Sequence, residues 1–98
     1  MAPLLDMQLL RVWEERLELG PTETYRVRRS QVTCTYEVPY RLVGYCHSDN
    51  TLYYDRGVDE ATIIHELLHK KYPDWTDSQV RHETKRLVGL IGGLTGST

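Results

Sequence analysis

A proline near the end of the chain, Pro73, constrains the fold more than any other residue because it separates two segments of helical periodicity. The residue before a proline is disfavoured in the helical region, so the first of these helices must end at this point. Thr76 and Gln79 follow directly with the spacing of a capping box, and Trp75 and Val80 have the spacing of a hydrophobic staple. The sequence therefore predicts two successive helices whose tight loop could fold them into an antiparallel hairpin.

The sequence also indicates where the first of these helices begins and where the second ends. Asp59 is suited to cap the first helix, and apolar residues then follow at steps of three and four up to Tyr72. We predict that the second helix runs from the capping box to about residue 91, where Gly92 and Gly93 end it. Residues 93–98 are expected to form a flexible tail.

The first half of the chain has other patterns. Leucines recur at helical spacing over residues 4–19, and Gly20-Pro21 ends that pattern. Segments rich in Val, Thr and Tyr then predict strands at 24–28, 31–38, 41–46 and 51–55. The 98 residues therefore form one domain of the α+β class. It has an N-terminal helix, a small three- to four-stranded, mostly antiparallel sheet, then the helix that ends at Pro73 and a second C-terminal helix.

The first helix of the hairpin carries the motif H-E-x-x-H, formed by His65, Glu66 and His69. Residues four apart lie on one face of a helix, so both imidazoles can reach one tetrahedral zinc ion. Glu66 lies about 100° around the helix axis from His65, so it can address a zinc-bound water without being a ligand. Zinc lowers the pKa of such a water to about 7, and we expect Glu66 to be the catalytic base.

A catalytic zinc ion needs a third protein ligand. Glu83 falls on the apolar stripe of the second helix, between Val80 and Leu87, whereas His82 falls on its polar face. Because an inward carboxylate is costly without a partner, we expect Glu83 to be this ligand. Two further candidates have the character of turn residues, namely His47 and Asp74.

The motif followed by a glutamate on the next helix resembles the gluzincin class of zinc metallopeptidases. The short chain and the run HELLHKKYPDW resemble its very small members, the minigluzincins. The resemblance covers about residues 51–91 and rests on His65, Glu66, His69 and Glu83. It implies an endopeptidase with one zinc ion, two histidine ligands, a glutamate ligand and a catalytic glutamate, in that order.

The resemblance also implies how substrate is bound. The strand before the active-site helix, through Leu52, Tyr53 and Tyr54, would line the cleft and pair with an extended peptide or unfolded protein. Backbone pairing of this kind accepts many sequences. The oxyanion of the reaction needs a donor as well, and Tyr72 and His82 are candidate transition-state stabilisers.

The gap between His69 and Glu83 is shorter than in the larger gluzincins. If the loop at Pro73 cannot return Glu83 to the zinc ion, His82 becomes the ligand. The site would then resemble the SprT-like three-histidine type, although the glycine-rich context expected around its third histidine is missing.

Composition and charge bear on partners and location. The net charge is −2, so no overall basic field attracts nucleic acid or a membrane surface. The start of the chain lacks a signal pattern and no segment approaches a membrane span, so we expect a cytoplasmic protein. Two alternatives to a peptidase remain: a zinc-binding but latent or inactive domain, and an α+β interaction module with a coincidental motif. The module would bind through Arg26, Arg28 and Arg29.

Overall fold

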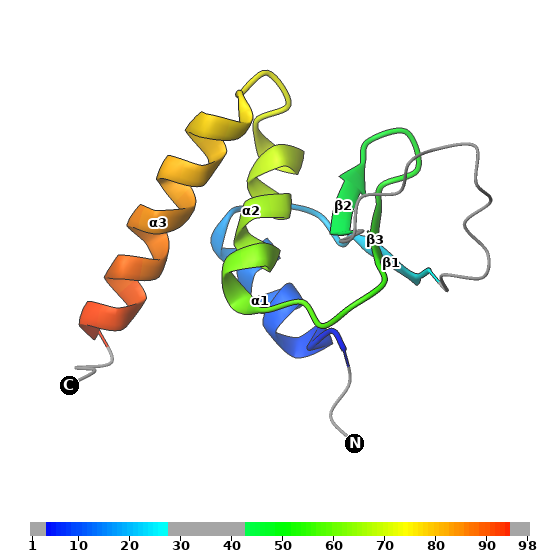
Figure 1. Cartoon of the computed structure of the whole chain (residues 1–98), viewed down its shortest axis with the longest axis horizontal. Coiled ribbons are helices and arrows are strands. Elements are labelled where there is room, and N and C mark those ends of the chain that lie inside the picture. The colour runs from blue at the N-terminus through cyan, green and yellow to red at the C-terminus, as the bar shows by residue number, and fades with distance from the viewer. Residues whose placement is uncertain (1–3, 28–42, 95–98) are drawn as a thin grey trace.

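The computed structural model describes residues 4–27 and 43–94, and its architecture is α+β (Figure 1). One helix precedes three strands and two further helices, so the predicted fold class is confirmed. The elements are α1 (Met7–Arg16), β1 (Glu23–Arg26), β2 (Val43–Cys46), β3 (Thr51–Tyr54), α2 (Glu60–Lys71) and α3 (Asp77–Leu94). The strand expected at 31–38 and the end of the expected tail, 95–98, lie outside the described residues.

The three strands form one mixed sheet in the order β1-β3-β2. β2 runs antiparallel to β3, with Cys46 opposite Thr51, as expected for strands joined by a short turn. β1 runs parallel to β3, with Glu23 opposite Thr51. Parallel strands need a long connection between them, so their pairing leaves no local signal in the sequence.

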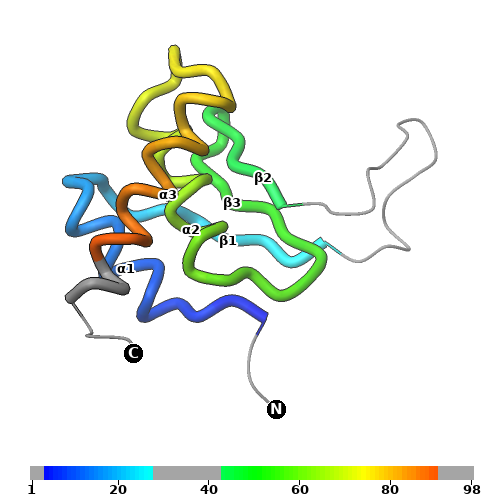
Figure 2. Tube along the Cα trace, turned by 60° about the vertical axis from the view of Figure 1, so that its left-hand side comes forward, coloured from blue at the N-terminus to red at the C-terminus, as the bar shows by residue number. Residues whose placement is uncertain are grey.

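The three helices gather on one side of the sheet, and α2 lies between the sheet and α3 (Figures 1 and 2). α2 therefore contributes four of the buried apolar side chains, and burying each contributes about 1.5–3 kcal/mol. This packing on several sides fixes the helix that carries the motif. The core consists of Leu5, Leu10, Trp13, Leu17, Leu52, Val58, Ile63, Ile64, Leu67, Leu68 and Val80.

α2 begins and ends where the sequence predicts. Asp59 caps its start, because the aspartate side chain accepts a hydrogen bond from the backbone N–H of Thr62 at 2.8 Å. The helix ends at Lys71, directly before Tyr72 and Pro73. The motif therefore lies in the middle and last turns of a helix whose position in the sequence was predicted correctly.

The capping box also begins α3 as expected. The backbone N–H of Thr76 donates to the side chain of Gln79 at 2.8 Å, and the N–H of Gln79 donates to the Thr76 hydroxyl at 3.2 Å. The helix continues through Gly92 and Gly93, which were expected to end it, to Leu94. Each glycine costs a helix only about 1 kcal/mol relative to alanine, which is not a strict stop. No helix within the described residues is long and apolar enough to cross a membrane.

α1 is shorter than the helix predicted over residues 4–19. Asp6 caps it by accepting a hydrogen bond from the backbone N–H of Leu9 at 3.1 Å. Leu5, just before the cap, forms an isolated parallel bridge with Val58 instead. This bridge ties the start of the chain to the segment that leads into α2.

Glu14 is a buried carboxylate that joins α1 to the loop before β1. It is 3% exposed and accepts hydrogen bonds from the backbone N–H of Thr22 and from the Arg11 guanidinium. The Lys70 ammonium at the end of α2 donates to the Thr22 hydroxyl at 2.8 Å and to the Gly20 carbonyl at 2.9 Å. This polar cluster anchors the last turn of α2 to the loop between α1 and β1.

Replacing Glu14 by alanine is expected to lower the free energy of unfolding by about 1–3 kcal/mol, because the buried N–H of Thr22 loses its acceptor. Glu15→Ala, on the exposed face of the same helix, is the matched control and should change the free energy by less than about 0.5 kcal/mol. Urea denaturation followed by circular dichroism measures both. Equal effects would show that Glu14 acts through helix propensity alone.

Candidate metal centre

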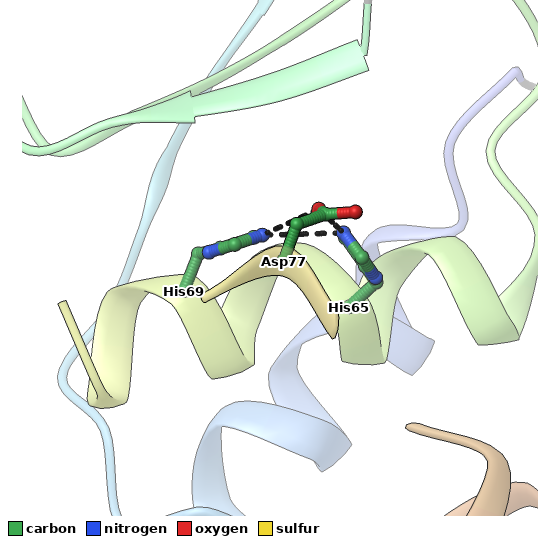
Figure 3. A group of neighbouring side chains, drawn as sticks. All are labelled: His65, His69 and Asp77. Atoms are coloured by element: carbon green, nitrogen blue, oxygen red, sulfur yellow. Dashed lines mark hydrogen bonds and ion pairs between the residues drawn. The ribbon is translucent and has the colours of Figure 1, made fainter. Parts of the chain in front are cut away.

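The two histidines of the motif lie one turn apart on α2 and turn their rings toward each other (Figure 3). Their Nε2 atoms are 3.2 Å apart, and their side chains are 23% exposed for His65 and 28% for His69. The apolar residues that precede each of them, Ile64 and Leu68, are buried in the core. The packing of α2 in the core therefore fixes the positions of the two imidazole rings.

Asp77, the first residue of α3, completes a group of three potential metal ligands. Its Oδ1 atom lies 3.1 Å from Nε2 of His65 and 3.3 Å from Nε2 of His69 (Figure 3). Within residues 4–27 and 43–94 this is the only such group of histidine, cysteine and carboxylate side chains. One atom from each residue could hold a metal ion.

Hydrogen bonds to Asp77 link the three converging atoms. A neutral imidazole that carries its hydrogen at Nε2 can donate it to Oδ1 of Asp77, whereas the other tautomer leaves at Nε2 a lone pair that could bind a metal ion. Burial and the neighbouring His69 lower the pKa of His65, which favours the neutral ring that a metal needs. Burial would raise the pKa of Asp77, but its hydrogen bond with His69 and the charges of His65 and Arg81 lower it overall. Both shifts favour the forms that bind a metal ion, the neutral imidazole and the carboxylate.

Glu66, the central residue of the motif, is nearly buried at 9% exposed. Burial raises the pKa of its carboxyl to about 7, while a hydrogen bond with the backbone of Tyr45 on β2 acts in the opposite direction. The side chain therefore lies between α2 and the sheet. It is not one of the three residues that converge at the candidate metal position.

A cleft of about 450 Å³ opens beside Glu66 and His65. Its walls come from β2, from the segment before α2, from α2 itself and from α3. The lining residues are Val43, Arg56, Asp59, Ala61, Thr62, His65, Glu66, Arg81 and Thr84. A ligand in this cleft would contact both the motif glutamate and one of the two histidines.

Glu83, the expected third ligand, is not among the three converging residues, and its role as a ligand stays a prediction. Its carboxylate accepts two hydrogen bonds from Arg86, at 2.6 and 2.7 Å. The buried residue of this turn is Thr84, at 7% exposed, so the inward stripe of α3 runs through Val80 and Thr84. Positions 83 and 84 lie on either side of the helix stripe that runs from Val80 to Leu87. Helical periodicity therefore could not tell which of the two residues is buried.

Asp77 is not among the candidate ligands predicted from the sequence, because its position at the start of a helix already explains an acidic residue there. An acidic residue directly after an N-cap interacts favourably with the helix dipole. The signal that could have found it is the short loop at Pro73. A tight turn between antiparallel helices places the first turn of the second helix beside the last turns of the first, and hence Asp77 beside His69.

The other candidate ligands also lie apart from the histidines of the motif. His47 makes a T-shaped ring contact with Tyr45, with centroids 4.9 Å apart. Asp74 is exposed in the loop between the helices, and His82 is exposed on α3. None of these three residues belongs to the converging group.

The two candidate transition-state stabilisers make other contacts in the structure. Tyr72 stacks on Trp75, with ring centroids 3.9 Å apart and planes inclined by 8°. His82 lines a separate cleft with Trp75 and Glu83. Neither candidate lines the cleft beside Glu66, so their catalytic role stays a prediction that no contact supports.

The strand expected to bind substrate, β3, is the central strand of the sheet. It pairs with β1 on one side and with β2 on the other, so its backbone has no free edge for a peptide. Leu52 is 1% exposed in the core, and the hydroxyl of Tyr53 donates to Asp49. Tyr54 packs against the core as well. Because β3 already pairs on both sides, no contact supports the expected pairing of this strand with substrate, which stays a prediction.

Comparison with known proteins adds no family. No protein-family model, no curated protein and no solved structure matches the chain. A function must therefore be inferred from the residues and the geometry of the site.

Proposed function

We propose that the chain is a zinc-dependent endopeptidase that holds one zinc ion through His65, His69 and Asp77. The observation that carries this proposal is the convergence of two Nε2 atoms and one Oδ1 atom at separations of 3.1, 3.2 and 3.3 Å. Ligand atoms about 2.0 Å from a tetrahedral zinc ion lie roughly 3.3 Å from one another. Three protein ligands also leave the fourth position open, as catalytic zinc sites require.

Two histidines and a carboxylate can also bind iron(II), so the ligands alone do not choose the metal. Glu66 favours zinc-dependent peptide hydrolysis, because a carboxylate that lines the same cleft as His65 is suited to proton transfer. It follows His65 directly in the motif that zinc peptidases use. The proposal therefore rests on Glu66 together with the converging ligands.

The chain's own residues have distinct tasks in the proposed reaction. A bound zinc ion would supply a Lewis acid and lower the pKa of a water molecule toward about 7. Glu66 would accept the proton of the attacking water and later deliver it to the leaving amine. His65 and Glu66 both line the cleft, so a peptide bound there would lie beside both groups.

This proposal keeps the histidines and the catalytic glutamate of the gluzincin resemblance and replaces its ligand glutamate by Asp77. The substrate class that the motif implies, an extended or unfolded polypeptide, is retained. The cleft between β2, α2 and α3 is its proposed binding place.

A zinc-binding domain without peptidase activity is the second candidate. The observation that favours it is the burial of Glu66, which is 9% exposed and interacts with the backbone of Tyr45. A carboxylate that is hydrogen-bonded to a strand of the sheet would stabilise the fold rather than transfer protons. The third alternative, an interaction module, depended on three arginines of which only Arg26 lies within the described residues.

Metal analysis combined with a cleavage assay tests the proposal. Protein purified without chelator is expected to contain about one zinc ion per chain and to cleave unfolded casein. Dialysis against a chelator should remove both zinc and activity, and stoichiometric zinc should restore them. The metal-free protein should also melt at a lower temperature, because zinc bound only by the folded state stabilises it.

Different outcomes separate the candidates. Iron in place of zinc would contradict the hydrolase proposal, and no metal at all would contradict every metal-dependent function. Stoichiometric zinc without cleavage of casein or of a mixed peptide library would favour the second candidate.

A further inference from the structure

Asp77 uses its two carboxylate oxygens for different partners. Oδ1 faces the two histidines, and Oδ2 accepts a hydrogen bond from the Arg81 guanidinium at 2.5 Å. Arg81 stands one turn further along α3, and its side chain also lines the cleft that contains His65 and Glu66. It therefore binds the carboxylate oxygen of Asp77 that the histidines do not contact.

This ion pair contributes little to the stability of the fold. The side chains of Arg81 and Asp77 are 66% and 55% exposed, and exposed ion pairs at this helical spacing typically add little to the stability of a protein. What the pair fixes is orientation. An arginine that holds one oxygen of a carboxylate leaves the other oxygen to face the histidines, and it limits rotation of the group.

We propose that Arg81 is a positioning residue of the metal centre, which holds Asp77 so that Oδ1 alone faces the metal position. This inference rests on the metal-binding part of the proposed function and not on peptidase activity. Residues that hydrogen-bond to a metal ligand typically change metal affinity or activity by 10–100-fold when they are replaced. Arg81 acts through Asp77 and need not touch substrate.

The chain contains a matched control for Arg81. Arg86, on the same helix, pairs with Glu83 at 2.6 Å and is exposed to a similar degree, at 55%. Its partner is not one of the converging ligands. Arg86→Ala therefore removes a comparable helical ion pair without changing the candidate metal centre.

Competition with a chromophoric chelator measures the zinc affinity of the folded full-length variants. Arg81→Ala is expected to weaken zinc binding about 10–100-fold. Arg86→Ala should bind zinc like the wild type. Arg81→Lys, which keeps the charge, should recover part of the loss. The melting temperatures of the metal-free Arg81→Ala and Arg86→Ala proteins should agree, which excludes a general loss of folding.

Wild-type zinc affinity in Arg81→Ala would overturn the inference, as would equal weakening by Arg81→Ala and Arg86→Ala. Both results leave the proposed function intact, because the wild type still binds zinc. A wild type that binds no zinc would instead remove the proposed function and this inference together.

Discussion

Replacing Asp77 by alanine is expected to weaken zinc binding by at least about 100-fold, while Glu83→Ala leaves it unchanged. Loss of a direct ligand should exceed the 10–100-fold effect typical of residues that only support a ligand. Oδ1 of Asp77 lies within 3.3 Å of both histidine Nε2 atoms, whereas Glu83 is paired with Arg86. Chelator competition on the folded proteins measures both affinities.

The two substitutions form a matched pair because both remove a carboxylate from α3 that accepts a hydrogen bond from an arginine. Asp77→Asn, which keeps an oxygen but loses the charge, should fall between alanine and the wild type. The reverse result, with zinc lost in Glu83→Ala and retained in Asp77→Ala, would restore the ligand set that the gluzincin resemblance implies.

Replacing Glu66 by glutamine is expected to lower the rate of peptide cleavage by about 10²–10⁴-fold and to leave the zinc content unchanged. Glutamine has the same shape and can still meet the sheet, but it cannot accept a proton from water. Because Glu66 is nearly buried, a neutral side chain should not destabilise the fold. Turnover of a fluorogenic peptide, together with metal analysis of the same samples, separates chemistry from metal loss.

The same substitution decides between the two metal-dependent candidates. Equal cleavage by the wild type and Glu66→Gln on every substrate would contradict the catalytic role of Glu66. Unchanged zinc content together with a change in melting temperature alone would indicate that Glu66 is structural.

The sequence predicted those features that short-range interactions determine. The Asp59 cap, the end of α2 before Pro73 and the capping box of Thr76 all depend on neighbours within one helical turn. They lie where the sequence indicates. The positions of α2 and of the motif on it follow from the same local rules.

Features that depend on distant contacts were not predictable in the same way. Glu83 and Thr84 lie on either side of the apolar stripe of α3, and only the packing of α3 on α2 selects Thr84 as the buried one. The parallel pairing of β1 with β3, which makes β3 central, joins segments far apart in the chain. Burial of Glu14 requires the loop that carries Thr22, which no helical pattern reveals.

The anchoring of α2 has a consequence for how a metal ion would assemble its ligands. Lys70 and Lys71, which follow His69 directly, donate hydrogen bonds to the carbonyl groups of Gly20 and Leu17. The segment between α1 and β1 therefore holds the end of α2 in place. Asp77 lies only eight positions after His69 in the chain. Bringing the two ends of so short a loop together costs little chain entropy. The fold therefore holds both histidines in place and a short loop brings Asp77 beside them, so that binding of a metal ion at the proposed centre would not require folding of the whole domain.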